Sequence, residues 1–211
     1  MKTIALFGGT GRTGQRFLDK ALSEGHSLKV LARDKKKLKQ NHENLKLVEG
    51  DVLNPEDVKK VVKGADIVVS LFGHVKGSPS ALQTDGTKNI IKAMQEFEVS
   101  RIISLSGGGL PFPEKDQPKF VDKLIRYIMK LAVPKVLNDA IAHAEILKKS
   151  DREWMIVRGP RLTNDEEKGT YKVGWVGVNA STKISRSDLA HFILKQVEDF
   201  EFNQQMPFVS E

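Results

Sequence analysis

Short apolar runs alternate with longer amphipathic stretches along most of this chain. Each run is four to seven residues long and consists of aliphatic and β-branched residues with few polar interruptions. Runs of this kind are typical of strands that are buried on both faces of a parallel sheet. They predict six strands, at Thr3–Phe7, Leu28–Ala32, Leu45–Val48, Asp66–Phe72, Arg101–Leu105 and Trp154–Val157.

The amphipathic stretches between these runs predict helices. Their expected bounds are Gly14–Ser23, Pro55–Lys63, Thr87–Phe97 and Phe120–Ala132. Pro55 fits the first position of its helix, and Asn54 before it fits an N-cap. Because strands and helices alternate, we expect right-handed crossovers between parallel strands. The pattern predicts one α/β domain over residues 1–211, a doubly wound Rossmann fold whose mostly parallel sheet carries helices on both faces.

Two segments, residues 107–135 and 159–185, depart from this alternation. Both follow the C-terminal ends of predicted strands, the edge at which open α/β sheets bind their ligands. We therefore expect them to form the substrate side of the molecule. The second segment is expected to be a loop with one short β hairpin around Thr170–Val173.

The predicted helix Phe120–Ala132 has one strongly apolar face. Its apolar residues are Phe120, Val121, Leu124, Ile125, Ile128, Met129 and Ala132, and its basic residues, Lys123, Arg126 and Lys130, lie elsewhere. Packing against the sheet explains such a face most simply. A substrate lid or a dimer surface is the alternative, and a role at a membrane surface is given less weight.

Composition narrows the class of protein. Hydrophobic residues make up 39% of the 211 residues and charged residues 29%, and no apolar run approaches membrane-spanning length. The chain has no cysteine, which excludes disulfides, thiolate catalysis and cysteine-bound zinc, and no spacing suggests a metal site. Its N-terminal apolar run is too short for a signal peptide, so a cytoplasmic protein is expected.

The net charge of +7 points to an anionic partner. Nucleic acid is not expected, because the lysines are scattered and no aromatic residues are interleaved with them. A small molecule fits better, bound by a protein that is a monomer or a homodimer and that has no membrane partner.

The most informative motif is the glycine-rich loop between the first strand and the first helix. It satisfies Gly-x-Gly-x-x-Gly, in which glycines permit the tight turn, the approach of backbone amides to a pyrophosphate and the close packing of helix on strand. The helix N-terminus would face the phosphates. We expect a dinucleotide to contact Gly8, Gly9, Thr10, Gly11, Arg12, Thr13 and Gly14. A tight turn without a ligand is the alternative, and the Lys-Ser/Thr of a P-loop is absent.

The end of the second strand bears on the choice of dinucleotide. Its first polar side chain is Arg33, followed by Asp34 and three lysines, where an NAD-selective site would place a carboxylate first. Arginine pairs with a phosphate but gains little from a hydroxyl, so the sequence predicts NADP, with NADPH bound in preference to NADH. Arg12 can reach the same region. Solvated surface charge is the alternative explanation of Arg33, and Asp34 leaves use of both cofactors open.

The remaining contacts to the cofactor are expected along the same sheet edge. The Asp51 carboxylate, next to Val52, would accept a hydrogen bond from the adenine amino group, although a helix-initiating turn explains Asp51 equally well. Gly73 after Phe72 leaves room for the cofactor ribose, and Ser104 ends the fifth strand beside the expected nicotinamide.

Several segments together resemble a known family. They are Ile4–Gly14, the Val30–Leu38 turn, Gly50–Asp51, Val69–Gly73, Ser104–Ser106, the Arg-Gly-Pro-Arg-Leu segment within Ile156–Leu162, and the Ile-Ser-Arg-Ser-Asp-Leu-Ala segment within Ile184–Phe192. This combination resembles the NAD(P)H-binding, flavin reductase-like atypical short-chain dehydrogenases, which include the biliverdin-IXβ reductases. The resemblance implies NADPH at the strand edge and a flavin-like or other planar acceptor over the nicotinamide.

The candidates for chemistry are Ser106 and Arg161. Ser106 matches the serine that the family places beside the nicotinamide, although it could equally be a strand-end cap. Arg161 could bind an acidic substrate or the cofactor phosphates, or form a surface salt bridge. Asp139 and His143, four residues apart on one helix, are interpreted as a helix-surface pair that could instead face the pocket.

Two functions are therefore open. The first is an NADPH-dependent reductase of a flavin, a quinone or a similar planar acceptor. The second is a non-catalytic, NADP-binding redox sensor. The second stays open because the Tyr-x-x-x-Lys pair of standard short-chain dehydrogenases is missing, with Leu131 at the fourth place after Tyr127.

Overall fold

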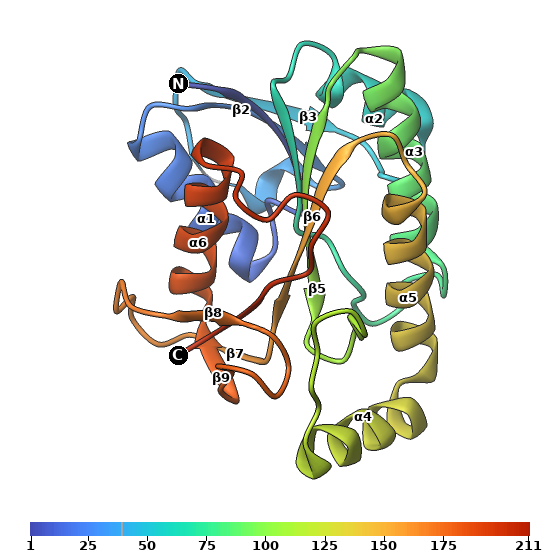
Figure 1. Cartoon of the computed structure of the whole chain (residues 1–211). Coiled ribbons are helices and arrows are strands. Elements are labelled where there is room, and N and C mark those ends of the chain that lie inside the picture. The colour runs from blue at the N-terminus through green and yellow to red at the C-terminus, as the bar shows by residue number, and fades with distance from the viewer. Residues whose placement is uncertain (39) are drawn as a thin grey trace.

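The central feature of the computed structural model, which describes residues 1–38 and 40–211, is a twisted eight-stranded sheet (Figure 1). Its strand order is β3-β2-β1-β4-β5-β6-β10-β8, and only the last pair is antiparallel. The strands are β1 (Thr3–Phe7), β2 (Ser27–Ala32), β3 (Leu45–Glu49), β4 (Ile67–Ser70), β5 (Arg101–Gly107), β6 (Glu153–Gly159), β8 (Lys172–Gly174) and β10 (Phe208–Ser210). A small parallel pair, β7 (Arg161–Thr163) and β9 (Lys183–Ser185), lies outside this sheet.

Helices cover both faces of the sheet (Figure 1). On one face lie α1 (Arg12–Ser23) and α6 (Arg186–Glu198), and on the other lie α2 (Pro55–Val62), α3 (Leu82–Glu96) and α5 (Pro134–Lys148). Successive residues of β1 alternate between two apolar cores: Leu6 packs toward α1 and α6, whereas Ala5 and Phe7 pack toward α2 and α3. The predicted doubly wound α/β fold is confirmed.

The predicted strands and helices are found, with differences at their ends. The predicted N-cap is confirmed, because the Asn54 side chain accepts a hydrogen bond from the Glu56 amide and Pro55 begins α2. Helix α3 begins at Leu82 rather than Thr87, and this extra turn is held by a carboxylate on α5, which no local pattern reveals. The hairpin expected around Thr170–Val173 is found only as one antiparallel bridge, between Trp175 and Val178, and β8 itself pairs with β10, far along the chain.

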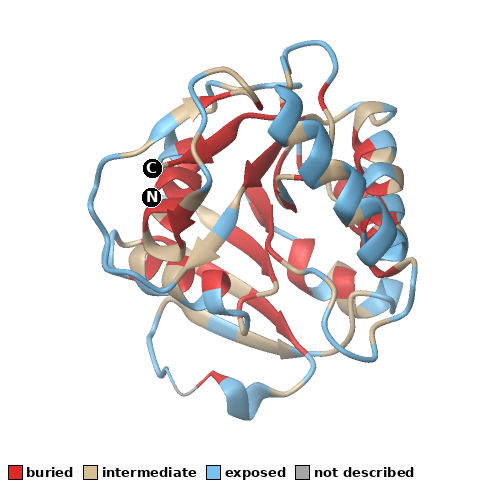
Figure 2. Cartoon of the chain, turned by 90° about the horizontal axis from the view of Figure 1, so that it is seen from below, coloured by how far each residue is buried: buried red, intermediate tan, exposed pale blue. Residues whose placement is uncertain are grey.

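Helix α4 (Phe120–Ala132) has the predicted bounds, but its surroundings differ from those predicted. None of its residues is buried, so the expected packing of its apolar face against the sheet is wrong. The helix lies at the lower end of the molecule in Figure 1 and faces the viewer in Figure 2, where its ribbon is mostly in the colour of exposed residues. It continues into α5 through Val133 and Pro134, and α5 is its main contact.

Candidate functional site

A cleft runs along the C-terminal edge of β1, β2 and β4. It encloses about 170 Å³. Its lining includes eight of the predicted cofactor-binding residues: Gly8, Thr10, Gly11, Arg33, Asp51, Val52, Phe72 and Gly73. The sequence did not predict Phe7, Leu31, Gly50, Leu71, Val75 and Leu82, which complete the lining. The strand ends thus bring together residues from four separate loops.

The glycines of the loop have different physical roles. Gly8 has a φ of +82°, and a Cβ there would lie 2.4 Å from the Phe72 nitrogen. A Cβ on Gly14 would lie 2.1 Å from the Gly8 carbonyl oxygen, so both glycines are required by the turn itself. Gly11 differs, because a Cβ there would meet only the Gly8 carbonyl oxygen, at 3.2 Å. The open side of Gly11 faces the cleft, which is the space that a bound pyrophosphate needs.

Helix α1 presents an uncapped N-terminus to this space. Gly11 is its N-cap and provides no side-chain hydrogen bond, and no acidic residue lies in the first turn. The first amides of a helix lack partners within the helix and carry a partial positive charge, which favours an anion. The loop therefore fits a dinucleotide pyrophosphate in both shape and charge.

Arg33 lines the same cleft and is exposed. The neighbouring carboxylate is occupied, because Asp34 accepts a hydrogen bond from the Lys36 amide and caps the short 3₁₀ turn Lys35–Lys37. This leaves a guanidinium, rather than a carboxylate, nearest the expected ribose. Arg12 is exposed but lies outside the cleft lining. The pKa of Arg186 is lowered, chiefly by burial and also by the positive charges of Arg12 and Arg16.

Asp51 and its neighbours form the adenine end of the cleft in our interpretation. The Asp51 carboxylate accepts a hydrogen bond from the Leu53 amide, at 2.9 Å, so it stabilises the local turn while it lines the cleft. The Val52 carbonyl accepts from the Asn89 side chain on α3, which fixes this loop. At Gly73, a Cβ would have no atom within 4 Å, so a ligand can pass close to the backbone there.

A second cavity, of about 410 Å³, lies farther along the same sheet edge, at the ends of β5 and β6. Both segments that depart from the βα alternation line it. The lining residues are Gly107, Gly108, Gly109, Asp122, Ile125, Arg126, Met129, Gly159, Pro160, Arg161, Val176, Ser181, Thr182 and Phe208. Its walls are mainly apolar, and two guanidinium groups are among its polar residues. It therefore suits a largely apolar molecule that carries an anionic group.

The two serines of β5 have different environments. Ser104 is buried, and its hydroxyl lies 3.1 Å from Nε2 of His143. Ser106 is buried one step before Gly107, and its hydroxyl has no hydrogen-bond partner among the described residues. A buried hydroxyl of this kind gains most from a ligand that pairs with it.

The interpretation of Asp139 and His143 as a pair on the surface of their helix is wrong, because both side chains are buried. The Asp139 carboxylate accepts hydrogen bonds from the Gln83 and Thr84 amides, and so caps α3. Burial alone would raise the pKa of Asp139, but these bonds and those from the Thr84 hydroxyl and His74 hold it below its ordinary value.

His143 lies between two hydroxyl groups, with Nδ1 at 2.8 Å from Thr87 and Nε2 near Ser104. Burial lowers its pKa to about 4, against a smaller opposing effect of Asp139. The imidazole is therefore neutral at physiological pH. It links α3, α5 and β5 behind the serine that we assign to the nicotinamide, and it is positioned to hold Ser104 rather than to supply a proton to a ligand.

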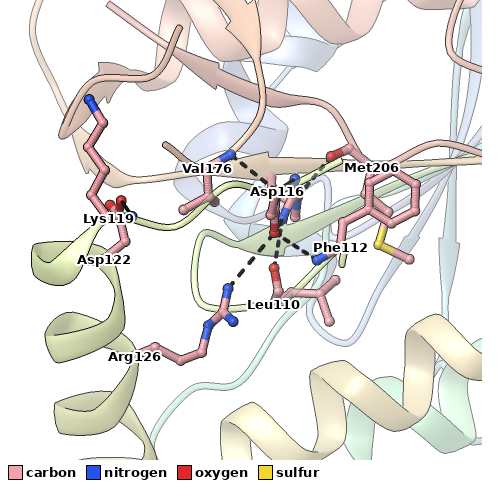
Figure 3. Close-up of polar contacts among 9 residues, drawn as sticks. Leu110, Phe112, Asp116, Lys119, Asp122, Arg126, Val176 and Met206 are labelled. Atoms are coloured by element: carbon pink, nitrogen blue, oxygen red, sulfur yellow. Dashed lines mark hydrogen bonds and ion pairs between the residues drawn. The ribbon is translucent and has the colours of Figure 1, made fainter. Parts of the chain in front are cut away.

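A buried ion pair that the sequence did not predict supports the second cavity (Figure 3). Arg158 on β6 is completely buried and donates two hydrogen bonds of 2.8 Å to Asp116. Asp116 also accepts from the Phe112 and Val176 amides, and Arg126 on α4 approaches it at 3.8 Å. Burial alone would raise the pKa of Asp116, but the bonds from Arg158 and the amides keep it below its ordinary value.

The profile of the NAD(P)H-binding family matches residues 8–200, which is most of the chain and includes all lining residues of the two cavities except Phe7 and Phe208. The chain belongs to the NAD(P)H-binding family. This membership confirms the relationship expected from the glycine loop and the segments around Ile156–Leu162 and Ile184–Phe192. The family to which this chain belongs binds a nicotinamide dinucleotide, NAD(P)H.

Two curated relatives of this NAD(P)H-binding protein are described as uncharacterized. YwnB of Bacillus subtilis is an uncharacterized protein that is 23% identical over 99% of this chain and 98% of its own length. An uncharacterized protein of Mycobacterium tuberculosis (strain H37Rv) is 30% identical over 112 residues. That match covers 53% of this chain but only 13% of the mycobacterial protein.

Solved structures of NAD(P)-binding proteins share the fold. A short-chain dehydrogenase/reductase from Veillonella parvula, crystallised in complex with NADP, has a TM-score of 0.84 at 19% identity, over 100% of this chain and 95% of its own. ChuY of Escherichia coli O157:H7, described as an anaerobilin reductase, has a TM-score of 0.78 at 18% identity, over 99% and 96%. These likenesses establish the architecture of the family member described here. No helix in the described part of the chain is long and apolar enough to cross a bilayer.

Proposed function

We propose that this protein is an NADPH-dependent reductase of a planar, anionic acceptor. The observation that carries the proposal is the second cavity, which lies at the same sheet edge as the dinucleotide cleft and next to it in strand order, since β5 follows β4. A cofactor laid from Arg33 across the glycine loop toward β5 would bring its nicotinamide to the mouth of this cavity. Bound NADPH supplies the hydride, and the protein supplies the binding and orientation of both molecules.

The cavity residues match a flat acceptor. Ile125 and Met129 on α4 and Phe208 on β10 provide apolar walls. The three consecutive glycines at the end of β5 have no side chains that would fill the cavity. Arg161 is exposed, and its side chain forms no ion pair among the described residues, in contrast to the salt-bridge alternative. Arg126 is shared with Asp116, at 3.8 Å, so Arg161 is the stronger candidate for an acidic group of the acceptor.

Ser106 is assigned a modest role. Its unpaired buried hydroxyl can donate a hydrogen bond to the acceptor or to the nicotinamide carboxamide. Hydride transfer between stacked rings depends chiefly on geometry, and no single acid is indispensable. The proton that completes the reduction can come from solvent through the open mouth of the cavity.

The steady-state test is NADPH oxidation with FMN, riboflavin and a neutral quinone. FMN and riboflavin share one ring system and differ in the phosphate, so their comparison isolates the anionic contact. Arg161→Ala should raise KM for FMN roughly tenfold, the value of one charge-assisted hydrogen bond, and change KM for riboflavin much less. Ser106→Ala should lower kcat by far less than the ~10²–10⁴-fold that removal of a general acid costs.

Arg101→Ala is the matched control, because it removes an arginine from the far end of β5, where it pairs with Glu153. It should leave all three acceptors unaffected. If the wild type binds NADPH tightly but oxidises it no faster than background with any acceptor, the reductase function is wrong. The NADP-binding sensor then replaces it. One observation favours that alternative. Tyr127 lies between lining residues of the second cavity in sequence, but its side chain is 60% exposed and does not line the cavity, so it is not placed to act as an acid there.

A further inference from the structure

The outward face of α4 is an apolar surface without a partner among the described residues. We call it the α4 face. It consists of Phe120, Val121, Leu124, Tyr127, Ile128 and Leu131, whose exposed fractions range from 46% to 80%. Contiguous exposed apolar surface on one helix marks a site of interaction rather than ordinary surface composition.

Helical geometry separates the α4 face from the second cavity, in which we propose that the acceptor binds. Positions three and four residues apart share a side of a helix, which groups Phe120, Leu124 and Leu131 on one side. The cavity is lined from the other side, by Asp122, Arg126 and Met129 among others. The α4 face therefore points away from the protein body, and closure of a lid over the acceptor would not bury it.

The charges around the face are of one sign. Residues 119–135 contain the basic residues Lys119, Lys123, Arg126, Lys130 and Lys135 and a single acidic residue, Asp122. The Asp122 carboxylate already accepts a hydrogen bond from the Lys119 amide. An apolar strip with phenylalanine, leucine and tyrosine, bordered by lysine, has the composition of helices that lie in the interface of an anionic bilayer.

We propose that α4 binds the surface of anionic membranes, with its axis in the plane of the bilayer. A helix of thirteen residues is about 20 Å long, well short of the ~30 Å hydrocarbon core, so it can lie on a bilayer but not cross it. Tyr127 suits this position because its ring is apolar and its hydroxyl can stay at the headgroups. From the amino-acid pattern alone this role ranks below packing against the sheet, but the structure buries none of the helix residues.

A second copy of the chain explains the face less well. A two-fold contact through α4 would bring Lys123 and Lys130 of one copy toward the same lysines of the other, with no compensating acid on the helix except Asp122. A stable interface needs about 800 Å² per partner. A strip on one helix, about 20 Å by 10 Å, offers only a fraction of that area. An anionic lipid surface instead complements the lysines and needs no matching shape.

The test is flotation of the purified chain with two kinds of vesicle, pure phosphatidylcholine and phosphatidylcholine with 30% phosphatidylglycerol. The chain should float with the anionic vesicles at low salt and not with the neutral ones. Phe120→Ser/Leu131→Ser should weaken binding at least tenfold, because it removes the two most exposed aliphatic and aromatic anchors. Lys123→Gln/Lys130→Gln should weaken it roughly 25-fold, about fivefold for each charge.

Lys88→Gln/Lys92→Gln removes the same charge from the exposed side of α3 and is the matched control. It should change binding by less than twofold. The proposal is overturned if the wild type does not float with anionic vesicles, or if the control loses as much binding as the α4 variants. It is also overturned if light scattering shows a dimer that Phe120→Ser/Leu131→Ser dissociates. Lipid binding is measured without acceptor or cofactor, so the result is independent of the reductase function.

Discussion

At the scale of single residues, we propose that Arg33 distinguishes NADPH from NADH. Its neighbour Asp34 is turned to the Lys36 amide, so the guanidinium faces the cleft without a competing carboxylate. Arg33→Ala should therefore lower NADPH affinity ten- to a hundredfold, which is roughly 1.5–3 kcal/mol for a hydrogen bond to a charged group. NADH affinity should hardly change, because NADH lacks the 2′-phosphate.

Calorimetric titration of both cofactors measures this difference. Lys37→Ala, an exposed neighbour on the same turn, serves as the control for a general loss of positive charge. Equal losses of NADPH and NADH affinity in Arg33→Ala would show that Arg33 does not contact the 2′-phosphate.

Residues of this site differ in how far a sequence reveals them. The glycines were predictable because a tight turn excludes Cβ atoms wherever it occurs, and the structure places Gly8 and Gly14 under that constraint. Asp116 and Arg158 were not, because 42 residues separate them and nothing in either local pattern indicates the other. The unpaired state of Ser106 likewise depends on which neighbours the fold brings to it.

At the scale of elements, the loop before α4 is held by the Asp116–Arg158 pair. Removing one partner of a buried pair leaves an uncompensated charge, which typically costs about 3–5 kcal/mol. Asp116→Asn should lower the free energy of unfolding by that amount, measured by urea denaturation. Glu153→Gln, which breaks the exposed pair with Arg101, should cost less than about 1 kcal/mol. A similar loss in both variants would mean that the buried pair does not hold the loop.

Because His143 links α3, α5 and β5, its protonation should make the free energy of unfolding depend on pH. The unfolded imidazole has an ordinary pKa of 6.5 and the folded one about 4, so the unfolded state binds more protons between these values. The stabilising contribution is complete above about pH 6.5 and is lost as the pH falls toward 4, by roughly 3 kcal/mol in all. Chemical denaturation at several pH values should show this loss.

His143→Gln keeps a donor and an acceptor near Thr87 and Ser104 but cannot titrate. Its stability should be flatter than that of the wild type between pH 6.5 and 4. Asp139 and other carboxylates lose their contributions in both proteins, so the difference between the two curves isolates His143. Parallel curves would exclude His143 as the source of the pH dependence.

The elements themselves were largely predictable, for a physical reason. Strands buried on both faces must be apolar throughout, and β1 and β4 therefore stand out in the sequence. The misplaced elements are those set by distant partners: α3 starts early because Asp139 of another helix caps it, and β8 exists because β10 pairs with it. The amphipathic pattern of α4 predicted a helix, but it could not show whether the apolar face packs against the sheet or remains exposed.

At the scale of the whole molecule, cofactor binding and folding should be linked. A ligand that binds only the folded state at a hundred times its Kd adds about 2.7 kcal/mol to stability. NADPH should therefore raise the midpoint of thermal unfolding of the wild type. Gly11→Val fills the space in front of the loop, where a Cβ meets only the Gly8 carbonyl oxygen, so it should fold and lose the effect. Stabilisation of Gly11→Val by NADPH would show that the loop does not bind the pyrophosphate.

The position of β10 in the sheet has a consequence for how the molecule is made. Phe208 on this strand lines the second cavity, whereas the lining of the first cleft includes no described residue beyond Leu82. Chains emerge from the ribosome N-terminal end first, and their early parts begin to fold before synthesis ends. During translation, every described residue that lines the first cleft is therefore made while more than half of the chain, including Phe208 of the second cavity, is still to be synthesised.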